Sequence, residues 1–162
     1  MQTQKIANFF KEAGCDYRNM EINKFYPISG WEILTRSLEG NVWRNVTHLV
    51  RKESSVPVVV KFNDTTLFVS PEHRFYASIG GVSSWVEAMD LIEEKSDVML
   101  LHESGEWVPA EFTAGDQEID ILDMTVDDCE SYFSDGILSH NTMYGDPTTT
   151  PGGELLASLA RA

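Results

Sequence analysis

The sequence predicts an all-β fold of curled antiparallel strands. Two observations lead to this fold class. Short runs rich in β-branched and aromatic residues recur along the middle of the chain, and pairs of Gly, Asn, Asp or Ser separate them. A chain of 162 residues, 42% of them hydrophobic, has room for one modest core. We therefore expect a single domain with short extensions.

The strand-like runs lie between Tyr26 and Leu138. Turn signals such as Asn63-Asp64 and Gly80-Gly81 separate them, because these residue types adopt the backbone angles that tight turns require. Many short strands joined by such turns are typical of curled, closed or paired sheets. The predicted strands cover residues 31–35, 42–50, 56–62, 66–69, 98–101, 107–112 and 119–126.

Three segments are predicted to be helical. Ser84-Trp85-Val86-Glu87 has the spacing of a capping box and predicts a helix that runs to Lys95. Residues 4–13 place Ile6, Phe9, Phe10 and Ala13 at helical spacing, which indicates an amphipathic helix. Residues 154–162 are rich in Leu and Ala and also favour a helix.

Composition excludes several classes of function. The net charge of −14 argues against nucleic-acid binding, which needs clustered Lys and Arg. No apolar run is long enough to span a bilayer and no signal-peptide pattern is present, so we expect no membrane partner. Two cysteines make a disulfide framework improbable and favour a cytoplasmic location, and we expect a monomer.

Two short strings near the ends of the chain carry chemistry. Gly14-Cys15 places a thiol directly after a glycine, and His140-Asn141-Thr142 places an amide between an imidazole and a hydroxyl. The composition changes at both strings. These changes divide the chain into an N-terminal flank (1–14), a middle segment (15–141) and a C-terminal flank (142–162).

Four blocks in the middle segment resemble the conserved blocks of inteins, in the family's order. The first opens at Cys15, the second is Phe68 to Phe75, the third starts at Ile121, and the last is Gly136 to Thr142. The resemblance covers residues 15–141, the size of a mini-intein without an endonuclease insert. It implies the horseshoe-shaped β fold called Hint, and autocatalytic cis protein splicing that acts once on the chain itself.

The flanks also resemble a known family when the middle segment is removed. Joining Gly14 to Thr142 gives a glycine before Thr-Met-Tyr-Gly-Asp-Pro-Thr-Thr-Thr-Pro-Gly-Gly. This is similar to a DNA-contacting loop of RecA-type recombinases. The resemblance implies that the flanks are extein segments of such a host and are the partners on which the middle segment acts.

The intein resemblance assigns a role to each candidate residue. Cys15 would attack the carbonyl of Gly14, whose missing side chain permits unusual backbone angles at this link. His73 would protonate the departing Cys15 nitrogen, with Ser70 hydrogen-bonding nearby. The remaining candidates are Asp123, which would assist attack by the Thr142 hydroxyl, and His140, which would assist cyclisation of Asn141.

Some positions depart from the intein pattern. Ser70 stands where Thr is usual, which keeps the hydroxyl. Glu130 falls where many inteins carry a His that assists Asn cyclisation, so we expect a slower last step that Glu130→His would speed. The histidines and cysteines form no zinc-spaced cluster, and the reaction requires no cofactor, so we predict neither metal nor cofactor.

Two other interpretations remain open at this point. A related autoprocessing domain would cleave one or both junctions without joining the flanks. A non-catalytic acidic β domain would only bind a partner. Thr142 favours ligation over cleavage alone, because ligation needs a nucleophile directly after Asn141.

Overall fold

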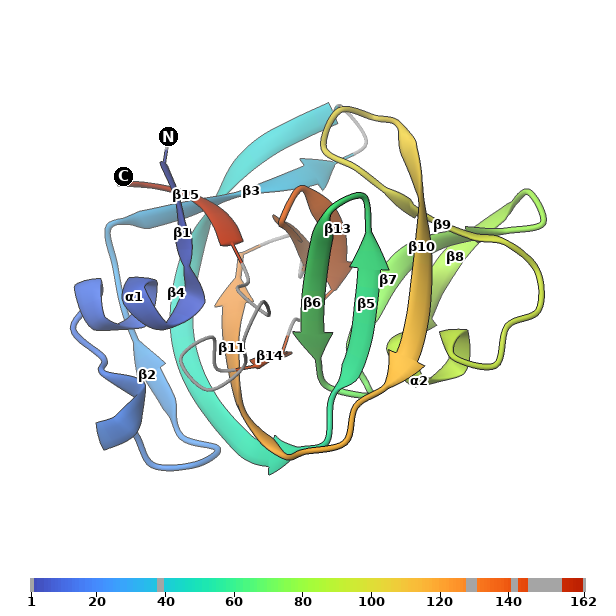
Figure 1. Cartoon of the computed structure of the whole chain (residues 1–162). Helices are drawn as coiled ribbons and strands as arrows, with labels where there is room; N and C mark the ends of the chain where they lie inside the picture. Colours follow the sequence, from blue (N-terminus) through green and yellow to red (C-terminus); the bar gives the residue numbers. More distant parts are fainter. Residues whose placement is uncertain (1, 38–39, 128–130, 141–142, 146–155, 162) are drawn as a thin grey trace.

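Antiparallel strands curl around a shared buried interior in the computed structural model, which describes residues 2–37, 40–127, 131–140, 143–145 and 156–161 (Figure 1). The all-β prediction is confirmed. The strands are β1 Gln2–Lys5, β2 Phe25–Pro27, β3 Trp31–Ser37, β4 Gly40–Ser55, β5 Val58–Phe62, β6 Thr65–Val69, β7 Arg74–Ile79, β8 Val82–Glu87, β9 Val98–Leu101, β10 Trp107–Ala114, β11 Ile119–Val126, β12 Ser131–Ser134, β13 Ile137–His140, β14 Met143–Gly145 and β15 Leu156–Arg161; the helices are α1 Ile6–Glu12, α2 Ala88–Leu91 and a 3-10 turn Tyr17–Asn19.

Two long strands turn the sheet by exchanging partners midway. Residues 40–45 of β4 pair with β3, and residues 46–55 pair with β11. In β10, residues 107–110 pair with β9 and residues 111–114 pair with β5. A register shift between Thr125 and Val126 of β11 adds twist where β4 changes partner. The sheet therefore bends round the core instead of lying flat.

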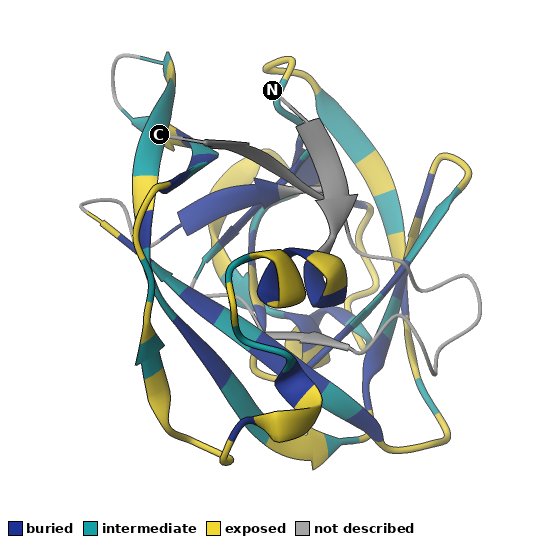
Figure 2. Ribbon diagram, turned by 90° about the vertical axis from the view of Figure 1, so that its left-hand side faces the viewer, coloured by how far each residue is buried: buried dark blue, intermediate teal, exposed yellow. Residues whose placement is uncertain are grey.

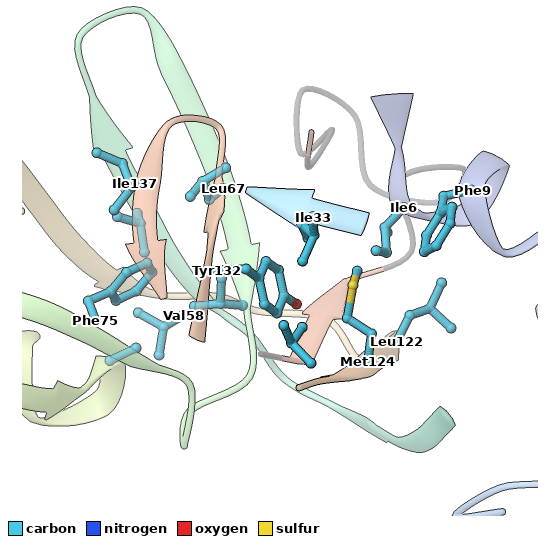
Figure 3. Close-up of a cluster of buried hydrophobic side chains, with 14 of the residues drawn as sticks. Ile6, Phe9, Ile33, Val58, Leu67, Phe75, Leu122, Met124, Tyr132 and Ile137 are labelled. Carbon is cyan, nitrogen blue, oxygen red and sulfur yellow. The ribbon is translucent and has the colours of Figure 1, made fainter. Parts of the chain in front are cut away.

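The interior is filled by buried residues of the strands. In β11 the side chains of Ile119, Ile121, Leu122, Met124 and Val126 are buried, and the alternation shifts by one residue between Ile121 and Leu122. Leu122, Met124 and Val126 form one cluster with residues of other strands and of α1 (Figure 3). The largest fully buried side chains are Tyr132, Phe9, Phe10, Phe75 and Phe133.

The helix of the N-terminal flank belongs to this core. The predicted amphipathic helix is confirmed over Ile6–Glu12, and residues 2–5 form β1 instead of its first turn. Ile6, Phe9 and Phe10 have no exposed surface, whereas the opposite side of α1 faces outward (Figure 2). The flank and the middle segment therefore pack as one body.

The predicted helix over residues 84–95 is wrong in most of its length. Ser84 to Glu87 lie in β8, where Ser84 pairs with Ala77 and Glu87 pairs with Arg74. The helix α2 begins only at Ala88. Its first N–H groups donate to backbone carbonyls, Ala88 N to His73 O at 2.7 Å and Met89 N to Pro71 O at 3.0 Å. Carbonyl groups of the turn before β7 thus accept the first N–H groups of the helix, the capping role that the sequence predicted for the Ser84 hydroxyl.

The prediction of a helix over residues 154–162 is also wrong for the residues that the structure describes. Leu156–Arg161 form β15, which pairs with β1, β3 and β12. A helix this short is only marginally stable without tertiary packing, whereas β1, β3 and β12 pair with this segment, so tertiary pairing overrides local helix propensity. Because β1 pairs with β15, the two flanks lie side by side (Figure 1).

Candidate functional site

The N-terminal junction is the C-terminal cap of α1. Gly14 N donates to Lys11 O at 3.1 Å, and Cys15 N donates to Phe10 O at 2.8 Å. These two bonds form a Schellman motif, in which the residue after the helix takes a left-handed conformation. Gly14 has φ +92°, and a glycine adopts this angle without the steric penalty of a side chain. The N–H of the Gly14–Cys15 link is therefore part of a defined helix cap.

Cys15 is half-buried and packs against the main core cluster. Burial raises the pKa of the Cys15 thiol, because the charged thiolate loses solvation. The thiol is therefore mostly protonated near neutral pH and requires a proton acceptor before it can act as a nucleophile.

Ser70 and His73 occupy a buried turn between β6 and β7. His73 N donates to Ser70 O at 3.1 Å, and the two residues are 0–2% exposed. The His73 ring lies 4.4 Å from the ring of Phe75, centroid to centroid. The Ser70 hydroxyl oxygen is buried without a hydrogen-bond partner among the described residues. A buried hydroxyl in this state is available to a group that enters the turn.

Backbone register relates the candidate residues Ser70, His73 and Asp123 to the described strands on either side of positions 141–142. His140 ends β13 opposite Arg74, the residue after His73. Met143 begins β14 opposite Asp123, and Tyr144 pairs with Val69, the residue before Ser70. Three consecutive Cα steps from His140 to Met143 span at most about 11 Å. The strands on either side of residues 70–73, and the strand that carries Asp123, therefore pair with β13 or β14, the described strands before and after positions 141–142.

Asp123 carries a strongly perturbed carboxyl. Burial raises the pKa of its carboxyl to about 7, and the N–H of Met124 at 2.8 Å and the charge of Lys52 offset only part of this rise. The side chain keeps some exposed surface, so the carboxyl is enclosed without being sealed from solvent. A carboxyl with this pKa exchanges a proton near neutral pH, as a general base or acid must.

Cys15 is linked to the other candidates only through shared packing. It contacts the same buried cluster that contains Phe75 and Met124, the neighbours of the turn and of Asp123. Glu130, Asn141 and Thr142 lie outside the described residues, so their predicted roles stay predictions. Over the part of the chain that the structure describes, no three His, Cys, Asp or Glu side chains are grouped to hold a metal ion.

The sequence interpretation missed Trp85, which it assigned to a helix cap. In the structure its ring centroid lies 5.1 Å from that of His140, with a 67° angle between the planes. The alternation of β8 would have placed Trp85 and Glu87 on one face had the segment been taken as a strand. Nothing in the sequence indicates that this face covers β13.

Comparison with known proteins identifies the fold. No family model matches the sequence, and no curated protein matches it. Among the described ranges, no helix is long and apolar enough to cross a membrane. Solved structures of inteins superpose on most of the chain at low sequence identity.

Three inteins illustrate the similarity. The DnaB intein of Synechocystis sp. PCC 6803 has a TM-score of 0.58 at 17% identity, over 70% of this chain and 79% of its own. The PabCDC21-1 intein has a TM-score of 0.58 at 17% identity, over 84% and 86%. The TvoVMA intein has a TM-score of 0.57 at 16% identity, over 93% and 86%. The chain therefore has the curled, antiparallel Hint fold of the inteins.

Proposed function

We propose that residues 15–141 are a cis-splicing mini-intein that excises itself and joins Gly14 to Thr142. The observation that carries this proposal is the strand register. It pairs the strands next to Ser70 and His73, and the strand of Asp123, with β13 and β14, between which the Asn141–Thr142 link falls in the sequence. The intein fold supports it. The reaction is single-turnover and intramolecular, and the flanks are its substrate.

In the first step the Cys15 sulfur bonds to the Gly14 carbonyl carbon, and the Gly14–Cys15 amide bond breaks. The nitrogen of Cys15 becomes an amine and takes a proton, for which His73 is the proposed donor, with Ser70 as a nearby hydrogen-bonding group. The raised pKa of the Cys15 thiol means that a base must first remove its proton. The product is a thioester.

In the second step the Thr142 hydroxyl oxygen bonds to the same carbonyl carbon and displaces the Cys15 sulfur. Asp123 is the proposed acceptor of the hydroxyl proton, because burial raises its pKa to about 7 and its strand pairs with the residue after Thr142. The released thiolate takes up a proton, and the N-terminal flank is now joined to Thr142 by an ester.

In the third step the side-chain nitrogen of Asn141 bonds to its own carbonyl carbon, and the bond to the Thr142 nitrogen breaks. His140 is the proposed donor of the proton to that nitrogen and the proposed acceptor of the proton that the Asn141 amide nitrogen loses, and the middle segment leaves with a C-terminal succinimide. The ester then rearranges to the more stable amide. Glu130 replaces the usual assisting His, so this step is expected to be slow.

We propose further that the flanks belong to a RecA-type recombinase of the cytoplasm. The support is the similarity of the joined flanks to a recombinase loop; the middle segment itself is proposed to be monomeric and to bind no nucleic acid. A mass measurement on the expressed chain tests the proposed reaction. Splicing yields segment 15–141 together with a product in which 1–14 is joined to 142–162.

The other outcomes of this measurement are equally specific. Separate flanks would indicate cleavage without ligation, and an intact chain would favour a non-catalytic binding domain. Cys15→Ala is expected to abolish the joined product while Asn141 cyclisation can still release the C-terminal flank. If Cys15→Ala left the joined product unchanged, the proposed chemistry would be wrong.

A further inference from the structure

A row of aromatic rings leads to the histidine of the C-terminal junction. Trp107 of β10 stacks on Tyr76 of β7 at 5.8 Å, Tyr76 meets Trp85 of β8 at 5.3 Å, and Trp85 meets His140 of β13 at 5.1 Å, all between ring centroids. Tyr76 and Trp85 are direct cross-strand partners, so the pairing of β7 with β8 places their two rings next to each other.

The contact between Trp85 and His140 bridges two strands that do not pair with each other. Both β8 and β13 pair with β7, and Arg74 of β7 is the register partner of Glu87 on one side and of His140 on the other. The Trp85 side chain therefore reaches across β7 to touch the imidazole.

A cavity of about 490 Å³ lies beside the indole of Trp85. Tyr76, Leu138 and Ser131 also line it, and Ser131 is the register partner of His140 on β12. Arg36 lines the same cavity, and the strand register places Arg74 opposite both His140 and Glu87.

We infer that Trp85 is a positioning residue for the last step of splicing, because its indole packs edge-on against the His140 imidazole from across β7. The inference rests on the proposed function. In that step the Asn141 side-chain nitrogen bonds to the Asn141 carbonyl carbon and the bond to Thr142 breaks. His140 gives its proton to the leaving nitrogen and takes up the proton that the Asn141 amide nitrogen loses as the ring closes. Trp85 takes no part in the bond changes and sets the ring orientation from which the proton is delivered.

The two half-reactions separate this role from general support of the fold. In a Cys15→Ala background only C-terminal cleavage is measured, and in an Asn141→Ala background only thiol-induced N-terminal cleavage is measured. We expect Trp85→Leu to slow C-terminal cleavage roughly tenfold, the size of effect that a mispositioned catalytic group produces. Trp85→Phe keeps a ring at this position and is expected to restore most of the rate.

Two controls and one spectroscopic readout accompany these variants. Trp107→Leu removes the far end of the row and is expected to leave C-terminal cleavage unchanged. Thiol-induced N-terminal cleavage by Trp85→Leu should match the parent, which shows that the variant is folded. In the Asn141→Ala protein the His140 ring protons should show a ring-current shift in the NMR spectrum that Trp85→Leu removes.

The outcomes are distinct. A Trp85→Leu protein that cleaves at the C-terminal junction as fast as its parent, or one that slows both junctions equally, would overturn the positioning role alone. Absence of C-terminal cleavage even with Trp85 in place would contradict the proposed function and the positioning role together. An unshifted His140 ring in the parent would overturn the contact itself.

Discussion

At the scale of single residues, Asp123 makes stability depend on pH. Burial raises the pKa of its carboxyl in the fold to about 7, against an ordinary value of 3.8. The unfolded chain therefore releases this proton at lower pH than the folded chain. Stability is expected to fall as the pH rises from about 4 to 7, by at most about 4 kcal/mol at 1.36 kcal/mol per pKa unit.

The test compares Asp123→Asn with its parent in a splicing-inactive Cys15→Ala, Asn141→Ala background. Urea unfolding at several pH values should show that the variant gains stability over its parent through this window, with the difference constant above pH about 7. Asp116→Asn changes an exposed carboxylate and should keep the parent's pH dependence. A difference between Asp123→Asn and parent that does not vary with pH would contradict the raised pKa.

Gly14 gives a second prediction at this scale. A Cβ added to Gly14 meets no atom within 4 Å, so a Gly14→Ala change costs only the left-handed backbone angle of φ +92°. This cost is about 1–2 kcal/mol. In the same inactive background, thermal or urea unfolding should show a loss of this size. An unchanged stability would mean that the helix cap at the junction does not persist in solution.

At the scale of elements, α1 is expected to stabilise the unspliced chain. Phe9 has no exposed surface and its ring meets that of Trp31 at 5.1 Å, so Phe9→Ala removes a buried ring from a packed site. Such changes cost about 3–5 kcal/mol. Lys11→Ala alters the exposed side of the same helix and is expected to stay within about 0.5 kcal/mol of the parent.

Urea unfolding of the inactive precursor checks this pair of variants. Equal, small effects at positions 9 and 11 would show that α1 does not pack in the core. The excised middle segment contains neither position 9 nor position 11, so its stability should be the same whether it comes from the parent or from either variant.

The elements differ in how well the sequence predicts them. Strands such as Trp31–Ser37 and Ile119–Val126 were predictable, because their residue types and alternation agree with their burial. The segment from Ser84 to Glu87 was not, because the carbonyls of His73 and Pro71 cap α2 from outside it. Residues 156–161 favour a helix locally, and their pairing with β1 and β3 cannot be read from that segment alone.

The candidate site shows the same limit. Its residues were found from short motifs, since thiol, imidazole and amide chemistry needs particular side chains at particular positions. The raised pKa of Asp123 and the contact of Trp85 with His140 depend on strands far apart in the sequence. Such features follow from tertiary packing and carry no local sequence signal.

At the scale of the whole molecule, the N-terminal flank and the middle segment share one core. Ile6, Phe9 and Phe10 are buried in it, with Leu122 and Met124 in the same cluster (Figure 3). If segment 15–141 is excised, these side chains leave with the joined flanks. The apolar surface that α1 covers then becomes exposed to water, which weakens the fold of the excised segment.

The inactive precursor should therefore be more stable than the excised segment 15–141. Burying a large apolar side chain contributes about 1.5–3 kcal/mol, so loss of the α1 contacts is expected to lower the free energy of unfolding by several kcal/mol. Urea unfolding of the two proteins measures the difference in free energy of unfolding. Phe9→Ala in the precursor should reproduce part of this loss of stability. The excised segment should also bind a hydrophobic dye that the precursor excludes. Equal stability of the two proteins, with no gain in dye binding, would mean that the middle segment buries its apolar core without the flank. The contacts of α1 would then contribute nothing to the stability of the fold.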